Sequence, residues 1–175
     1  MNQILKQLIG GDLRSIGRGN EVVQQILDNP QLFPDVFEGL TSDEPIIRMR
    51  SADVIEKVAK QHPEYLQPFK SQLINEISRI DQKEVQWHVA QMFAYLTIDQ
   101  SERDTIMNIL LTYLSQDTGA IVKTFSMQTL AIFAERYPDI RPEIIELIEC
   151  LMKTGSPAII TRGNKLLSRL KARTT

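Results

Sequence analysis

The sequence repeats at intervals of 37 to 38 residues, and this period limits the folds open to the chain. Aliphatic residues recur at Ile47, Val85, Val122 and Ile159, and each opens a stretch in which apolar residues return at helical spacing. A repeat of this length is a pair of helices, which cannot bury its apolar face alone. Stacking successive pairs buries a shared core, so the period predicts a helical repeat array with one continuous core.

The clearest copy of the repeat is the segment Asp43–Lys60, DEPIIRMRSADVIEKVAK. Pro45 is tolerated in the first turn of a helix, where backbone N–H groups have no intrahelical partner. Helical spacing puts one set of residues on a single face, which we expect to be buried: Ile47, Ser51, Val54, Ile55 and Val58. The small side chains of Ser51 and Ala52 predict that another helix approaches this one closely.

Short links divide the chain into further helix pairs. We expect a single domain, residues 1–175, with repeats at 20–40, 43–80, 83–115 and 119–152 and a half-repeat at 156–173. The second helix of the 43–80 repeat is expected near 68–80. Ser101, with Asp104 three residues later, is similar to a capping box for the next second helix. The aligned positions that we expect in the core are Ile55, Phe93, Leu130 and Leu167.

The run PIIRMRSADVIEKV at Pro45–Val58 resembles the first helix of a HEAT repeat: a proline, an aliphatic–arginine pair, two small residues and then spaced aliphatic residues. Lys123 keeps the basic second residue, whereas Gln86 and Ile160 do not. The resemblance implies an all-α fold, a right-handed α-α superhelix (HEAT/armadillo-like solenoid) with about four helix pairs plus flanking helices. The chain also resembles small stand-alone bacterial HEAT-repeat proteins of unassigned function, so the resemblance implies a fold but no activity.

The composition is that of an ordinary soluble protein, with 42% hydrophobic and 24% charged residues among 175. Cys150 is the only cysteine, which excludes an internal disulfide and fits a reducing compartment. No apolar run approaches the roughly 20 residues that a membrane span needs. The first residues, MNQILKQLIGGD, lack a signal-peptide pattern. We therefore expect a cytoplasmic protein.

The charge is unevenly spread along the chain. The net charge is −2, but residues 153–175 carry six basic and no acidic side chains, which leaves 14 basic and 22 acidic residues in 1–152. The bulk of the chain should therefore repel nucleic acids and anionic membranes, and only the last helix should attract them. The basic residues of that helix are Arg162, Lys165, Arg169, Lys171 and Arg173.

Candidate catalytic residues are few and scattered. His62, His88 and Cys150 fall in different parts of the repeat, whereas a zinc site needs about four ligands in clustered spacing. No nucleophile elbow, phosphate-binding loop or paired-carboxylate motif is present. We expect neither an enzyme nor a metal or cofactor site.

Equivalent repeat positions carry residues suited to binding a partner. Stacked repeats should place them on successive helices, and we name this set the predicted ridge: Arg48, Arg50, Trp87, His88 and Lys123. Arginine and tryptophan are the side chains that most often dominate binding energy at interfaces. The alternatives are structural: Trp87 fills a groove between repeats, and the charged residues satisfy helix ends or pair with nearby acids.

These features predict a non-catalytic scaffold, expected to be a monomer, that presents a solenoid surface to a protein or peptide partner. The second helices, with Lys70, Arg79 and Asn108, offer an alternative surface. The alternative function is a nucleic-acid-associated protein that contacts phosphates through its basic C-terminal helix. A DNA-binding solenoid should be basic along its concave face, and this chain is acidic outside its last helix, so nucleic acid and membranes are not expected partners.

Overall fold

The computed structural model describes residues 2–116 and 119–172, and all regular structure within these ranges is helical. The all-α prediction is therefore confirmed, while the handedness of the superhelix stays a prediction. The chain forms two compact units, Met1–Thr97 and Ile98–Thr175. Each unit is described by itself, and the expected single continuous core stays a prediction.

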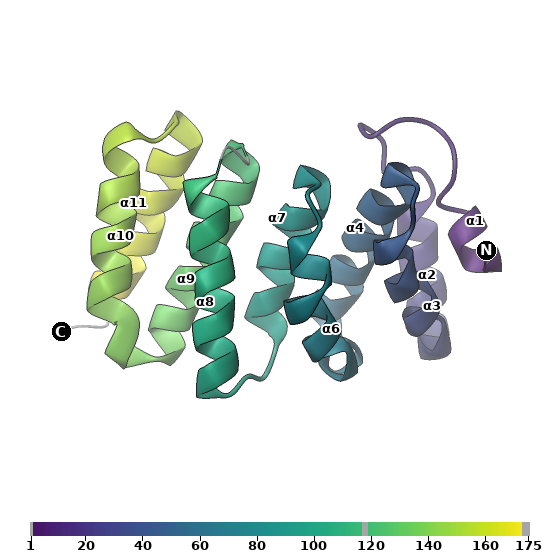
Figure 1. Cartoon of the computed structure of the whole chain (residues 1–175), viewed down its shortest axis with the longest axis horizontal. Coiled ribbons are helices and arrows are strands. Elements are labelled where there is room, and N and C mark those ends of the chain that lie inside the picture. Colours follow the sequence, from purple (N-terminus) through teal and green to yellow (C-terminus); the bar gives the residue numbers. More distant parts are fainter. Residues whose placement is uncertain (1, 117–118, 173–175) are drawn as a thin grey trace. The chain divides into compact units, whose positions relative to one another are not determined.

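The first unit consists of two rows of helices (Figure 1). One row contains the first helices of the repeats, and α4 contacts both of its neighbours in that row, α2 and α7. The other row contains shorter helices, of which α3 packs on α4. The bounds are α1 Gln3–Lys6, α2 Gly19–Asp28, α3 Phe33–Glu38, α4 Pro45–Gln61, α5 Pro63–Leu66, α6 Lys70–Asn75 and α7 Lys83–Met92.

Helix α4 is the centre of this unit. The predicted face is confirmed, since Ile47, Ser51, Val54, Ile55 and Val58 are all buried. The burial extends further than one face, because α2, α3 and α7 surround the helix and eleven of its seventeen residues are buried. Three charged residues lie among them, Arg50, Asp53 and Glu56. A helix covered on several sides can bury such groups only where each finds a polar partner.

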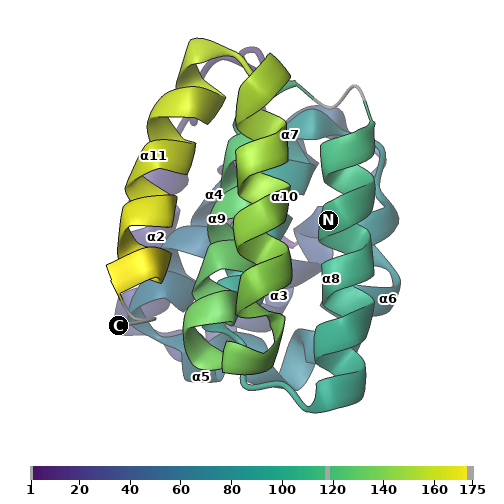
Figure 2. The ribbon, with the colours of Figure 1, turned by 90° about the vertical axis from the view of Figure 1, so that its left-hand side faces the viewer.

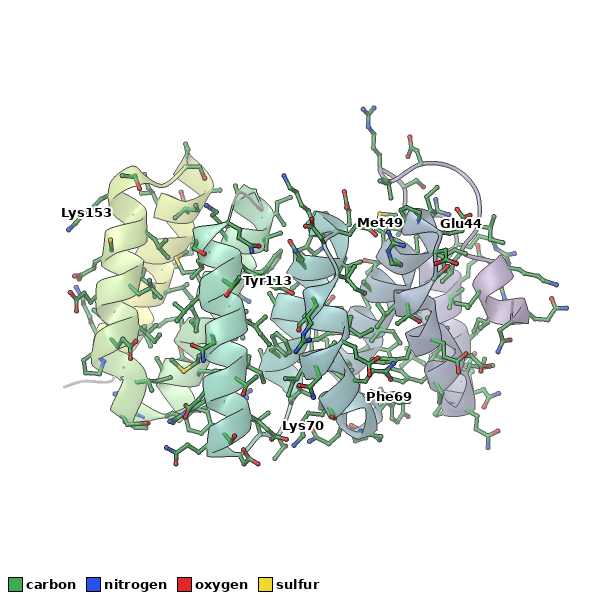
Figure 3. The ribbon with its side chains drawn as sticks, viewed as in Figure 1. Glu44, Met49, Phe69, Lys70, Tyr113 and Lys153 are labelled. Atoms are coloured by element: carbon green, nitrogen blue, oxygen red, sulfur yellow. The ribbon has the colours of Figure 1, made fainter. Side chains whose placement is uncertain are left out.

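The second helices of the first unit are interrupted by short 3-10 turns. The single helix expected near 68–80 is instead α6, flanked by turns at Gln67–Phe69 and Ile77–Arg79. Pro68 accounts for the first break, because it has no N–H to continue a helix. Aromatic rings then join the repeats across this row: Phe69, labelled in Figure 3, stacks on Phe37 with ring centres 4.4 Å apart.

The second unit contains four long helices, α8 Gln100–Ser115, α9 Ala120–Arg136, α10 Arg141–Thr154 and α11 Pro157–Ala172. Helix α9 contacts α8, α10 and α11. Figure 2 shows α10 and α11 side by side, and α11 in yellow closes this unit at its C-terminal end. The expected capping box lies two residues earlier than predicted: Asp99 accepts from the N–H of Glu102 at 2.8 Å, and Glu102 accepts from the N–H of Asp99.

The repeat register is visible in the burial of equivalent residues. All four aligned core positions are buried, namely Ile55, Phe93, Leu130 and Leu167. Close helix approach occurs where the small residues predict it, because a Cβ added to Gly39 would collide with the hydroxyl of Ser51. Gly39 follows α3 and Ser51 lies on α4, so glycine sets the distance between the two rows at this point.

Candidate functional site

Arg48 lies half-buried in the first turn of α4 and is held by three hydrogen bonds. Its Nε donates to Oε1 of Gln82 at 2.8 Å, and its Nη1 donates to the carbonyls of Ser42 at 2.7 Å and Asp43 at 3.1 Å. Gln82 in turn donates to the carbonyl of Pro45. The remaining nitrogen, Nη2, makes no hydrogen bond within the described residues. One edge of a positioned guanidinium is therefore available to an incoming acceptor.

Arg50, which we expected on the exposed ridge, is buried with only 2% of its surface accessible. Its guanidinium donates to three backbone carbonyls of the N-terminal link, those of Leu8 at 2.8 Å, Ser15 at 2.9 Å and Asp12 at 3.4 Å. The ridge prediction is wrong for this side chain, because it points inward and binds the chain's own backbone. Its role is to hold the link against α4.

His88 is also buried, at 8% exposure, and does not belong to an exposed ridge. It faces Asp53 and Lys57 of α4, which form an ion pair at 2.7 Å. Burial lowers the pKa of His88 to about 4; Asp53 opposes this shift and Lys57 adds to it. The Nδ1 atom has no hydrogen-bond partner within the described residues. His88 is therefore neutral at neutral pH and acts as an interior side chain.

Trp87, the neighbour of His88, remains half-exposed on α7. Its ring lies 5.5 Å from that of His88, tilted by 58°. Its indole N–H makes no hydrogen bond within the described residues and is not among the buried unsatisfied atoms. The ring thus makes a tilted contact with a buried side chain, while its donor is open to solvent. Such a side chain is suited to anchor a partner.

Lys123 lies half-buried in the first turn of α9 in the second unit, and its ammonium has no ion-pair partner within the described residues. The basic side chains of α11 are different, because most of them are engaged. Arg169 pairs with Glu135 at 2.6 Å, and Lys171 pairs with Glu149 at 2.7 Å. Arg162 donates to Oε1 of Gln128 at 2.6 Å. The basic stripe predicted for this helix is therefore largely bound to α9 and α10.

The alternative surface on the second helices is also visible in the structure. Lys70, labelled in Figure 3, donates to the carbonyl of Thr97, while Arg79 is exposed. In the second unit, Asn108 is exposed on α8 and lines an open hollow together with Asp104 and Thr105. These residues form shallow polar surfaces without an aromatic anchor.

Two polar pairs, each with one buried member (Glu56 and Arg103), escaped the sequence analysis. Tyr95 donates to Oε1 of Glu56 at 2.6 Å in the first unit. In the second, Arg103 donates through Nη1 to both carboxylate oxygens of Asp139 and lies over the ring of Tyr137. Each pair is about 36 to 39 residues apart, close to the repeat period. That spacing was the only signal for them.

The described residues contain no group of three or more His, Cys, Asp and Glu side chains that could hold a metal ion. Within the same residues, no helix is both long and apolar enough to cross a membrane. The hollows are open and shallow. One of them, of about 630 Å³ in the first unit, is lined by Pro63, Glu64, Pro68 and Tyr95. Neither this hollow nor the one beside Asn108 brings together a nucleophile, a base and an orienting group, the arrangement that acyl-transfer sites share.

The HEAT repeat domain family matches residues 13–170 of this sequence, which is nearly the whole chain. The chain belongs to the HEAT-repeat family. The stacked helix pairs are thus HEAT repeats, and their surfaces are those of a helical repeat scaffold. No curated protein and no solved structure gives a significant match.

Proposed function

We propose that this chain is a non-catalytic, cytoplasmic HEAT-repeat scaffold that binds a protein or peptide partner. The observation that carries the proposal is the state of Trp87, a half-exposed ring seated on a buried histidine with an unbonded indole N–H. Rigid aromatic side chains with one polar group are the usual anchors of protein interfaces. The membership of the HEAT-repeat family supports the same reading, since repeat scaffolds present extended surfaces for recognition.

The proposed surface of the first unit consists of Arg48 on α4 and Trp87 on the adjacent α7. The free edge of the Arg48 guanidinium would donate to a carboxylate or carbonyl of the partner, and Trp87 would supply apolar contact. Arg50 and His88 support this surface from within rather than touching the partner. Lys123 is proposed as a contact of the second unit.

The test is an affinity capture from the source cells with the wild-type chain as bait, followed by measurement of the affinity for the captured protein. Trp87→Ala should weaken that affinity by roughly 30-fold, the size of an interface hot spot, and Arg48→Ala by roughly tenfold. Both variants should keep the melting temperature of the wild type. Lys70→Ala and Asn108→Ala are the matched controls on the second helices.

If Trp87→Ala and Arg48→Ala remain folded and bind like the wild type, the proposed surface is wrong. A loss confined to the Lys70 and Asn108 variants would move the site to the second helices. The nucleic-acid alternative has less support, because Arg162, Arg169 and Lys171 are engaged within the second unit. A gel-shift assay at about 50 mM salt tests it, since phosphate contacts strengthen as salt is lowered.

A further inference from the structure

A stretch of eight residues near the N-terminus exposes three aliphatic side chains. Ile9, Leu13 and Ile16 are 52%, 42% and 40% accessible, and only two other large aliphatic side chains of the described residues, Ile121 and Ile160, are similarly exposed. Single exposed aliphatic residues are normal on protein surfaces, but a group of them within one segment usually marks an interaction site. We name these three residues the N-terminal apolar edge.

Arg50 fixes the conformation of this edge through the backbone. The three carbonyls that accept from its guanidinium belong to Leu8, Asp12 and Ser15, and each of these residues directly precedes one member of the apolar edge. When a carbonyl is held pointing inward, its peptide group is fixed, and this restricts the orientation of the side chain on the next residue. One buried guanidinium therefore fixes the backbone directly before each of the three aliphatic side chains.

Two glycines allow the link to approach the guanidinium this closely. Gly11 and Gly17 have φ angles of +76° and +54°, which glycine adopts without a steric penalty. A Cβ added to Gly17 would lie 2.7 Å from Nη1 of Arg50, so a larger residue would push the link away. The N-terminal apolar edge is thus ordered before any partner arrives, which lowers the entropy cost of binding.

A hollow of about 700 Å³ lies between this link and the start of α4. Leu13, Pro45 and Ile46 give it apolar walls, Arg14 lines the side of the link, and Glu44, labelled in Figure 3, lines the opposite side. Leu13 belongs both to this hollow and to the N-terminal apolar edge, so the hollow adjoins the edge at this residue.

We propose that the N-terminal apolar edge is a docking site for one amphipathic helix of a partner protein. The apolar residues of that helix pack on Ile9, Leu13 and Ile16, and acidic residues along one border face Lys6 and Arg14. This site deepens the scaffold function proposed above and rests on it. The docking site specifies the class of partner, an acidic amphipathic helix. Arg48 and Trp87 alone do not identify that class.

The charge of the surrounding side chains favours an acidic border. Lys6 and Arg14 are exposed and form no ion pair within the described residues. Arg18 is engaged by Glu21 at 2.6 Å, and the carboxylate of Asp12 accepts from the backbone N–H of Arg14. Lys6 and Arg14 are therefore unpaired cations that acidic residues of an incoming helix can pair with, while Glu44 across the hollow opposes an acidic residue on its own side.

Two other occupants fit less well. A second copy of the chain would need roughly 800 Å² of contact per partner for a stable dimer, and three half-exposed aliphatic side chains supply a small part of that area. An anionic membrane is a broad surface, and the net charge of −8 over residues 1–152 opposes its approach more than that of one short helix, which meets only the charges beside the edge. A single helix needs only a few anchors at successive turns and matches the size of the edge.

The test uses two synthetic peptides of about 18 residues, each with leucines at i, i+3, i+4 and i+7. One has glutamates along the borders of the leucine face and the other has lysines. Binding to the full chain is measured by fluorescence anisotropy at about 50 mM salt, where charge effects are weakly screened. We expect the glutamate peptide to bind at least about tenfold more tightly than the lysine peptide.

The variants locate the site. Leu13→Asp should weaken binding of the glutamate peptide by at least about tenfold, whereas the control Ile121→Asp, at an exposed isoleucine of the second unit, should not. Arg14→Glu should reverse the preference between the peptides. No binding of the glutamate peptide at about 1 mM chain, equal binding of both peptides, or full binding by Leu13→Asp would each overturn the proposal.

Arg50→Lys tests the positioning role, because an ammonium cannot reach three carbonyls from one planar group. Hydrogen exchange in residues 11–17 should accelerate and peptide affinity should fall. If the Arg50→Lys chain does not fold, Leu13→Asp and Arg14→Glu still test the docking site. Both residues are exposed, so these substitutions should leave the fold intact. Two results would show that the edge binds something other than a helix, and either would overturn the proposal. One is binding to phosphatidylserine vesicles that depends on Leu13, and the other is a dimer that Leu13→Asp dissociates.

The two proposals fail separately. Loss of peptide binding in Leu13→Asp with unchanged capture of the Trp87-dependent partner supports the docking site alone. A peptide that binds regardless of Leu13, together with a captured partner that requires Trp87, removes the docking site and leaves the scaffold function in place.

Discussion

The hydroxyl of Tyr95 donates to the carboxylate of Glu56 across 2.6 Å, joining the end of the third repeat's first helix to the middle of α4. Glu56 is buried, and its carboxylate accepts this hydrogen bond from Tyr95. A hydrogen bond to a charged group contributes more than one between neutral groups. The pair is therefore a stability element within the first unit.

Tyr95→Phe should lower the free energy of unfolding by about 2 kcal/mol, because it leaves the buried carboxylate of Glu56 without this donor.

Burial, with help from Glu56, raises the pKa of Tyr95 above its ordinary value. The folded state therefore keeps this proton when the unfolded state releases it, and stability should fall as the pH rises above about 10. Urea unfolding checks both effects. Tyr65→Phe is the control, since the Tyr65 hydroxyl makes no hydrogen bond within the described residues, and an equal loss there would contradict the prediction.

Phe93→Ala should destabilise the chain by about 3–5 kcal/mol, the usual cost of removing a fully buried aromatic side chain. Phe93 is completely inaccessible and occupies one of the aligned core positions of the repeats. Chemical denaturation monitored by circular dichroism gives the free energy. Ile121→Ala, at an exposed isoleucine, should change it by less than about 0.5 kcal/mol. A loss below about 1 kcal/mol at Phe93 would show that the core register is different.

His88 should make the folded state sensitive to acid. Its pKa is about 4 when folded and ordinarily 6.5, so the unfolded chain takes up a proton that the folded chain excludes. Stability should fall as the pH drops from about 6.5 toward about 4, by about 3 kcal/mol from this residue. Urea unfolding across this range measures the slope, and His88→Gln should remove much of it. His62→Gln, at a histidine with a 40% exposed side chain, is the control and should leave the slope unchanged.

Gly39→Ala should destabilise the chain by about 1–3 kcal/mol, because the added methyl group collides with Ser51 on α4. The collision involves the side chains of Ser51 and Leu5, so Ser51→Gly in the same chain should relieve part of it. Thermal melts of both single variants and the double variant complete a double-mutant cycle. Purely additive effects would mean that the two rows do not meet at this pair.

The fold was predictable because its main signal is periodic. Ile47, Val85, Val122 and Ile159 mark the repeat in the sequence, and all four are buried in the structure. The continuity of the second helix near 68–80 was not predictable from apolar spacing alone. Ile74 and Ile77 remain buried across a break in the helix, so the same pattern fits a continuous and an interrupted segment.

The ridge was only partly predictable, because adjacent helical residues point in directions about 100° apart. Trp87 and His88 share one turn of α7, and the sequence does not decide which of them faces the neighbouring helix. Hydrophobicity favours burying the tryptophan, yet the structure buries the histidine. Arg50 was missed for another reason. Its acceptors are backbone carbonyls, which every residue carries, so no side-chain pattern could identify them.

The contact between Arg50 and the carbonyl of Leu8 joins residues 42 positions apart, and this separation has a consequence during synthesis. At about 5–20 residues per second, a ribosome needs roughly 2–8 s to add the arginine after the leucine. Throughout that interval Ile9, Leu13 and Ile16 have no guanidinium to order the link between them. This apolar segment therefore leaves the ribosome before the residue that fixes it is added, and a chaperone that recognises short aliphatic segments would meet it before α4 is complete.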